Sequence, residues 1–294
     1  MSSALRTPRN LFRDDARARG ASGEPVTVMI AAFDGWNDAG AAASEALEFL
    51  GRQFETQDVP VEGLDRFIDY SQHRPVLTSH SNGTGDIQWP GISVQSFTAQ
   101  DGDLRILLVR GPEPSFAWKE FTEQLLGLAK EHHVQYLLQL GSLLAEVPHT
   151  RPLPLSLTSY DRFLRNSPGI QRQTYSGPTG IVGVLAHSAR NFGIADLSAW
   201  VSIPHYAGHP PHPKATYALL QCIERLLDVP LPLKVVEDEV FAWERGAAEL
   251  MDEEPELAAY VSQLEADSEA DPLDSVSGED IAAEFEQFLK RRDR

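Results

Sequence analysis

Asp34-Gly35-Trp36-Asn37-Asp38-Ala39-Gly40 joins two segments of different character. Residues 26–33, which come before it, are almost all apolar, as is typical of a strand covered on both faces. Residues 41–50, which follow it, are rich in alanine and have helical periodicity, so we expect a helix over 39–54. A strand, a glycine-containing turn and a helix in this order are typical of open α/β folds, in which such turns carry ligand and partner contacts.

The alternation of apolar strands and amphipathic helices continues to about residue 232. Apolar runs predict strands at residues 67–70, 87–97, 104–109, 134–140 and 196–203, and helical periodicity predicts helices at 112–132, 180–192 and 213–227. Gly141 is expected to turn the chain after the fourth of these strands. Strands joined by crossover helices predict a mostly parallel sheet between helical layers, with an antiparallel portion among the middle strands. We therefore expect a three-layer α/β/α sandwich over residues 25–232.

The two ends of the chain differ from this core. Residues 1–24 lack apolar periodicity, which predicts a flexible N-terminal segment. After residue 232 only helices are expected, at 233–251, 256–265 and 279–290, with an acidic, serine-containing linker near 266–278. The chain is thus predicted to carry an acidic helical extension over 233–294.

The charge and composition of the chain exclude several classes of partner. Its 294 residues have a net charge of −18, and residues 233–294 hold nineteen acidic and six basic residues, a net −13. So acidic a chain is not expected to bind nucleic acid, which needs clustered lysine and arginine. No apolar run is long enough to span a membrane and no secretory signal opens the chain, so we expect a cytoplasmic protein without a membrane segment. The single cysteine, Cys222, excludes an intramolecular disulfide and is expected to be a buried thiol.

Three loops that follow predicted core strands form the candidate functional site. They span residues 34–40, 141–152 and 204–216. If their strands are parallel, the loops meet at one edge of the sheet, where α/β proteins place their sites. A further segment, 177–180, opens a helix whose backbone N–H groups could bind an anion. The candidate ligand or partner residues are Asp34, Trp36, Asn37, Asp38, His149, Arg151, Thr179, His205, Tyr206 and Lys214, with His212 in the same third loop.

Each of these positions also has a structural interpretation. Asn37 or Asp38 is suited to capping the helix that follows, and Thr179 to capping the helix that begins at residue 180. Trp36 is interpreted as a wedge in its loop or at an interface rather than as a platform for a cofactor. His149 and His205 each follow a proline, where a bond to a nearby backbone carbonyl would account for them.

No complete catalytic or cofactor motif occurs in the sequence. Gly-x-Ser-x-Gly, the phosphate-binding Gly-x-x-x-x-Gly-Lys-Ser/Thr loop and Gly-x-Gly-x-x-Gly are all absent. His205, His209 and His212 are close in sequence, but their spacing fits no helical metal pair and no cysteine accompanies them. We therefore expect no cofactor and no metal, and we assign no catalytic residue.

Five sequence blocks together resemble the proteasome assembly chaperone 2 family. They lie at residues 33–40, 146–152, 177–181, 201–206 and 213–216, in the order in which the family has them. The chain is most similar to the prokaryotic, actinobacterial-type branch, which has an acidic helical C-terminal extension. The resemblance implies an α/β/α sandwich of the nucleoside phosphorylase-like kind and frequent self-association. Eukaryotic members act as paired chaperones in the assembly of proteasome α-rings.

The family blocks, the missing motifs and the acidic extension favour a non-enzymatic, oligomeric protein-interaction protein. Its expected partners are further copies of itself, in a small ring such as a trimer, and proteasome subunits. Some archaeal relatives look like proteasome activators that dock a C-terminal hydrophobic-Tyr-any residue tail, and this chain, which ends in Lys290-Arg291-Arg292-Asp293-Arg294, lacks that tail.

An alternative remains open from the residues alone. The chain would then be a small-ligand-binding protein or a hydrolase-like or phosphorylase-like enzyme that uses the loop cluster. Asp34 or Asp38 would act as a general base, and Arg151 or Lys214 would hold an anion.

Overall fold

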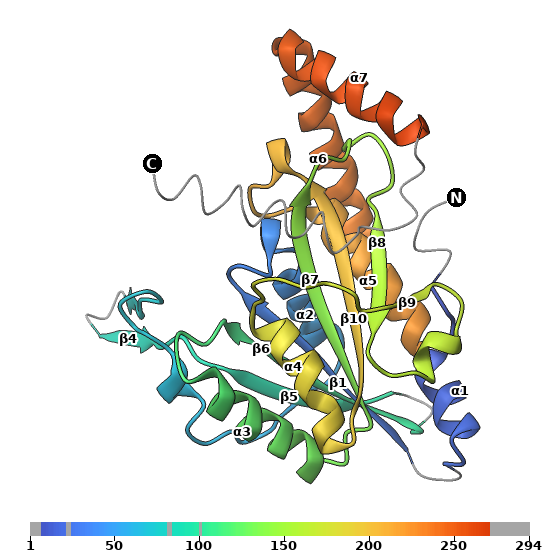
Figure 1. Cartoon of the computed structure of the whole chain (residues 1–294). Helices are drawn as coiled ribbons and strands as arrows, with labels where there is room; N and C mark the ends of the chain where they lie inside the picture. Colours follow the sequence, from blue (N-terminus) through green and yellow to red (C-terminus); the bar gives the residue numbers. More distant parts are fainter. Residues whose placement is uncertain (1–6, 22–24, 81–83, 100–101, 271–294) are drawn as a thin grey trace.

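The structure, a computed structural model, describes residues 7–21, 25–80, 84–99 and 102–270. Its main sheet has eight strands in the order β2-β5-β6-β1-β7-β10-β8-β9 (Figure 1). The four central strands, β6 (Leu104–Pro112), β1 (Val26–Asp34), β7 (Tyr136–Ala145) and β10 (Ala195–Pro204), are parallel. Antiparallel pairing adds β5 (Ser93–Thr98), β2 (Gln57–Asp58) and β8 (Leu155–Ser159), and β9 (Ile170–Arg172) runs parallel to β8. A separate hairpin consists of β3 (Val76–Ser79) and β4 (Gly85–Gln88).

Helices cover both faces of the main sheet (Figure 1). One face carries α1 (Leu11–Ala18), α2 (Ala42–Gln53) and α5 (Pro213–Leu227), and the other carries α3 (Trp118–Glu131) and α4 (Ile181–Ala189). The side chains of β1 alternate between the two cores, with Val28, Ile30 and Ala32 in the first and Met29, Ala31 and Phe33 in the second. A central strand must be apolar on both faces to be covered in this way. The predicted three-layer α/β/α fold with a mostly parallel sheet is confirmed.

Strand β7 is longer than the sequence predicts. It continues through Gly141 to Ala145, so the predicted turn at Gly141 is wrong. Gly141 lies opposite Trp200 on β10, and a Cβ atom at position 141 would come within 2.6 Å of the indole ring. This glycine therefore makes room for a large neighbour instead of bending the chain.

The segment between α2 and α3 also departs from the prediction. Residues 67–70 are not a strand, because a 3₁₀ helix, η3 (Asp65–Phe67), and a turn occupy them. The single strand expected at 87–97 is two strands, β4 and β5, because Trp89-Pro90-Gly91 separates them. The helix expected from residue 112 begins at Trp118, because Pro112 is still paired in β6.

Part of the N-terminal segment is ordered structure, so the predicted flexible segment at 1–24 is wrong for residues 11–18. These residues form α1, and Leu11, Phe12 and Ala16 are buried against the core. Arg13 is buried with them, and its guanidinium bonds to Asp103 at 2.8 Å and to the carbonyl oxygen of Leu227 at 2.5 Å. Eight residues are too few for an apolar stripe to stand out among so many charges in a sequence.

After residue 232 the chain forms α6 (Lys234–Glu253) and α7 (Pro255–Ala270), which stand at one end of the sheet (Figure 1). They agree with the helices predicted at 233–251 and 256–265. The linker predicted near 266–278 is helical as far as Ala270, and its remainder and the helix predicted at 279–290 lie outside the described residues. Within the described part of the chain, no helix is long and apolar enough to cross a membrane.

Candidate functional site

The three candidate loops meet at the carboxyl edge of β1, β7 and β10, which are parallel neighbours. The first loop is joined to the last residues of β7 by a backbone bridge between Asp38 and Ser142. The Ser142 N–H donates to the carbonyl oxygen of Asn37 at 2.9 Å, and the Ser142 hydroxyl to that of Ala39 at 2.7 Å. The third loop joins through the N–H of His212, which donates to the carbonyl oxygen of Gly40 at 3.0 Å. The edge is therefore held together by the main chain.

Asp38 caps the helix that follows it. Its carboxylate is buried and accepts hydrogen bonds from the N–H of Ala43 at 2.7 Å and from the hydroxyl of Ser44 at 2.5 Å. Burial raises the pKa of Asp38, and the bonds from Ser44 and Ala43 oppose that rise. The residue at the N-cap position of α2 is Ala41, which has a left-handed conformation and no side chain that could accept a hydrogen bond. The Asp38 carboxylate therefore supplies the acceptor that the first turn of α2 needs.

Asn37 belongs to a second capping arrangement, which the sequence did not reveal. Its side-chain N–H donates to Glu113 at 2.9 Å, and the same carboxylate oxygen accepts the N–H of Ile181, the first residue of α4, at 2.8 Å. Burial raises the pKa of Glu113, which these two bonds oppose. The N-terminus of α4 thus binds an anion, which the helix dipole favours at that end. The anion is the carboxylate of Glu113, from the same chain.

The predicted capping role of Thr179 is wrong. Gly180 occupies the N-cap position of α4, and no side chain bonds to the helix from there. The Thr179 side chain is exposed, and its hydroxyl lies 3.5 Å from the carbonyl oxygen of Gly180. Glu113 was overlooked because it comes from a loop 68 residues earlier, and no local signal connects the two positions.

Asp34 and Trp36 lie at the rim of the edge. Asp34 ends β1 and is exposed, and its carbonyl oxygen accepts the N–H of Glu113 at 3.0 Å. Trp36 is 37% exposed, so the indole is neither sealed in the core nor fully solvated. The loop from residue 113 therefore runs directly beside the Trp36 loop.

His149, Tyr206 and Lys214 form a compact polar cluster between the second and third loops. The N–H of His149 donates to the Tyr206 hydroxyl at 2.8 Å, and that hydroxyl lies 2.8 Å from Nδ1 of the same histidine. Lys214 donates to the carbonyl oxygen of His149 at 2.5 Å. Burial and the Lys214 charge lower the pKa of His149, and burial raises that of Tyr206 to about 12. Both side chains are therefore neutral at pH 7.

His212 lies beneath this cluster and is wholly buried. Its Nδ1 accepts the N–H of Ala215 at 3.2 Å and so caps α5. Burial lowers the pKa of His212 to about 4. A side chain at Gly40 would place its Cβ 2.7 Å from that of His212, so the first loop can approach only because residue 40 is a glycine.

The helices α6 and α7 cover the second and third loops. Glu244 on α6 accepts from Lys214 at 2.6 Å, and Trp243 contacts the rings of His212 and His149 at centroid distances of 4.5 and 6.0 Å. On α7, Tyr260 contacts the rings of His205 and Tyr206 at 5.6 and 6.0 Å, and Glu265 accepts from Thr150. The sequence did not indicate which loops these helices cover, although Trp243 stands out as an aromatic residue in an acidic helix.

The candidate residues thus divide into two groups. The first group lies near the end of β1, beside Glu113, and consists of Asp34, Trp36, Asn37 and Asp38. The second group lies under α6 and α7 and consists of His149, His205, Tyr206 and Lys214. Arg151 is exposed on the loop between β7 and β8. Among the described residues, no three His, Cys, Asp or Glu side chains are grouped as a metal site would require. Most of these polar groups bond to neighbouring parts of the chain.

Comparison with known proteins identifies the relationship. A model of the PAC2 family matches residues 32–251. The chain belongs to the PAC2 family. Two crystal structures are each 38% identical to it, and each alignment covers 80% of this chain and 99% of the other. They are a PAC2 family protein from Streptomyces avermitilis (TM-score 0.74) and a proteasome-assembly chaperone homologue from Mycobacterium tuberculosis (TM-score 0.71).

Weaker similarity extends the PAC2 fold beyond these bacteria. An archaeal proteasome activator from Pyrococcus furiosus is 12% identical, with a TM-score of 0.56 over 78% of this chain and 95% of its own, which shows a shared fold alone. No curated protein matches the chain. The PAC2 match includes all ten candidate residues and most of α6, but it ends before α7.

Proposed function

We propose that this PAC2 protein is a non-enzymatic, self-associating factor that acts in the cytoplasm as a proteasome-assembly chaperone and binds proteasome subunits. The observation that carries the proposal is the 38% identity with a Mycobacterium tuberculosis proteasome-assembly chaperone homologue across 99% of that protein. Similarity over nearly the whole length of a related chain supports a shared mode of action better than similarity of fold does.

The geometry of the carboxyl edge supports a binding role over chemistry. Asp38 and Asn37 serve helix ends, and Lys214 is bonded to a carbonyl oxygen and a carboxylate. A general base or an anion clamp has to reach a substrate instead. The enzyme or small-ligand alternative therefore has less support, because two of its four candidates, Asp38 and Lys214, are bonded within the protein. It would have to rely on Asp34 and Arg151, which are exposed.

The test is affinity capture of the tagged full-length chain from its native cell under mild conditions, with quantitative mass spectrometry. We expect enrichment of proteasome subunits over a tag-only control. Reproducible absence of every proteasome subunit would contradict the proteasome role. Purified α-subunits, mixed with the chain and followed by native mass spectrometry, then establish whether the contact is direct.

A further inference from the structure

Exposed apolar side chains are concentrated in one part of the surface. Ten large hydrophobic residues are exposed in the described part of the chain, and six of them come from the β3–β4 hairpin and the loops beside it. These six define what we call the hairpin patch: Trp36, Val76, Leu77, Ile87, Trp89 and Phe116. The other four are Phe163, in the segment after β8, and Val235, Phe241 and Leu250 on α6, and single exposed apolar residues are ordinary on a protein surface.

Contacts between the supporting loops link the segments that carry the hairpin patch. Tyr70 and Trp89 meet edge to face at a centroid distance of 5.0 Å, which holds the base of the hairpin to the loop after η3. The hydroxyl of Ser115, next to Phe116, accepts the N–H of Asp69 in that same loop at 3.0 Å. The Trp36 loop adjoins on the other side through the bond from Glu113 to Asp34.

The hairpin itself is incompletely packed. Leu77 and Ile87 face each other across its two strands, and every residue of both strands is exposed. Within the described residues, β3 and β4 pair only with each other. Figure 1 shows the hairpin projecting from the body of the molecule, well away from α6 and α7. A two-stranded sheet without a covered face is marginally stable in water, and its strand edges are open to pairing.

The size of the hairpin patch suits a protein interface. Large apolar side chains have about 150–250 Å² to bury, and the six are between 37% and 68% exposed, which leaves on the order of 600 Å². The largest apolar patch of an ordinary monomer is about 300–600 Å². A standard interface buries about 800 Å² per partner, so the hairpin patch and its rim would be enough for one.

Charge identifies the occupant. Residues 65–92 hold two arginines and three aspartates, a net −1, in a chain whose net charge is −18 and whose extension over 233–294 carries −13. Two copies that met through the acidic helices would repel each other, whereas segment 65–92, which forms the hairpin, is nearly neutral and lies well away from α6 and α7 (Figure 1). We propose that the hairpin patch is the surface through which one copy of this chain binds a second copy. This inference rests on the self-association in the proposed function and names its contact surface.

The test compares the molar mass of two matched double variants of the full-length chain by size-exclusion chromatography with light scattering. Leu77→Glu with Ile87→Glu alters residues that are 68% and 53% exposed, and Val235→Glu with Phe241→Glu alters α6 residues that are 64% and 59% exposed. We expect wild type and the α6 variant to have a multiple of 32.5 kDa at tens of micromolar, and the hairpin variant to be near 32.5 kDa. Its dissociation constant should rise by about a hundredfold, as for a central interface residue.

Salt provides a second readout. Because both copies are strongly acidic, raising the ionic strength from about 0.05 M to about 0.5 M should strengthen wild-type association by screening their repulsion. The hairpin variant should remain monomeric at both ionic strengths. If circular dichroism shows that the hairpin variant is misfolded, Trp36→Ser is used in its place. Trp36 lies in a different loop of the hairpin patch, and its replacement should weaken the same contact.

Three results would overturn the inference. They are a wild-type chain that is monomeric at tens of micromolar, a hairpin variant with unchanged mass, and equal loss of mass in both double variants. A monomer whose hairpin patch binds another protein would also overturn it, because the occupant would then not be a second copy. Capture of proteasome subunits is scored separately, so an oligomer that captures none contradicts the proposed function and leaves this inference intact.

Discussion

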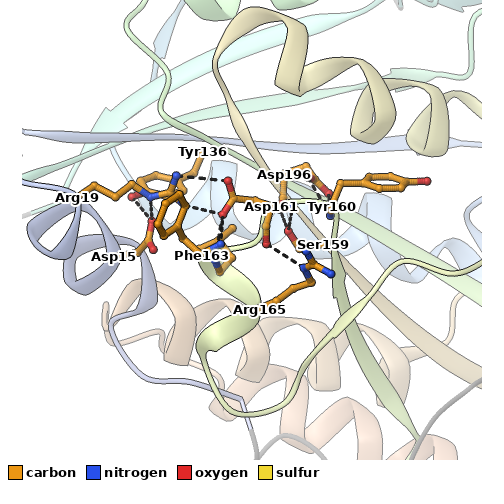
Figure 2. A network of polar contacts seen from close by, with 10 residues as sticks. Asp15, Arg19, Tyr136, Ser159, Tyr160, Asp161, Phe163, Arg165 and Asp196 are labelled. Atoms are coloured by element: carbon orange, nitrogen blue, oxygen red, sulfur yellow. Dashed lines mark hydrogen bonds and ion pairs between the residues drawn. The ribbon is translucent and has the colours of Figure 1, made fainter.

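The two ends of the sheet are covered by helices that differ in how they are held. At the amino end of β7, the eight-residue α1 buries three apolar side chains and joins a network of charged groups (Figure 2). Arg19, just after α1, bonds to Asp15 at 2.5 Å and to Asp161 at 2.7 Å. Tyr136 on β7 donates to the same Asp15 carboxylate at 2.8 Å.

At the carboxyl end, the covering helices are longer and less deeply buried. Val236 is the one buried residue of the twenty in α6, and Val261 and Leu264 are the buried residues of α7 among those described. Their remaining attachment consists of the ring contacts of Trp243 and Tyr260 and a few polar bonds. Local stability follows buried apolar area and not helix length. We therefore expect α1 to unfold only with the whole domain, and α6 and α7 to open separately.

The largest predicted effect is that of Phe12→Ala. Phe12 is 1% exposed and contacts the Tyr136 ring at a centroid distance of 5.0 Å, so removing it leaves a cavity between α1 and β7. The free energy of unfolding should fall by about 3–5 kcal/mol, measured by urea denaturation. The control Phe241→Ala, on the exposed face of α6, should change it by no more than about 0.5 kcal/mol. Similar losses in both would show that α1 is no better anchored than α6.

The next effect is a pH dependence of opposite sign at the two ends. Burial lowers the pKa of His212 from 6.5 to about 4, so below pH 6.5 the unfolded chain binds a proton that the folded chain does not. Acidification to pH 4 therefore removes up to about 3 kcal/mol of stability at the carboxyl end. Burial raises the pKa of Asp196, at the amino end of β10, from 3.8 to about 6. At Asp196 the folded chain holds the extra proton, so acidification from pH 6 towards pH 3.8 adds a similar amount to the free energy of unfolding.

These opposing contributions can be separated with two variants. Asp196→Asn removes the stabilising protonation of Asp196. The free energy of unfolding, measured in urea, should then fall more steeply than in wild type between pH 7 and pH 5. His212→Asn keeps a side-chain oxygen for the N–H of Ala215 and should make the fall shallower. If the three pH profiles were parallel, neither group would titrate as its burial requires.

Trp243→Ala should have an intermediate and local effect. The indole contacts His149 and His212, and its loss removes much of the contact between α6 and the loops. Amide hydrogen exchange in α6 and α7 should accelerate by about tenfold or more, while α2 and α5 exchange as in wild type. Acceleration throughout the domain would mean that α6 and α7 unfold with the core.

These contrasts also indicate which features a sequence can reveal. The parallel strands were predictable because β1, β7 and β10 are buried on both faces and therefore read as apolar runs. The capping role of Asp38 was predictable because it acts on the helix that follows it directly. Glu113, Trp243 and Tyr260 were not, because each reaches its partner across many residues of chain and leaves no local pattern. The burial of α1 was missed for a different reason, since an eight-residue helix has too short an apolar stripe.

The smallest predicted effect is that of Glu244→Gln, which neutralises the ion pair with Lys214. The Lys214 side chain is 12% exposed and that of Glu244 is 38% exposed, so solvent screens the pair from one side. Lys214 keeps its bond to the carbonyl oxygen of His149, and the glutamine oxygen can still accept from it. The loss of stability should therefore be less than about 1 kcal/mol.

Glu249→Gln, an exposed change on the same helix, is the matched control and should alter the urea midpoint less. Salt distinguishes the two variants further, because raising it should weaken the contact in wild type and leave Glu244→Gln unaffected. A loss in Glu244→Gln as large as that of Phe12→Ala would mean that α6 is held by charge as firmly as α1 is held by packing.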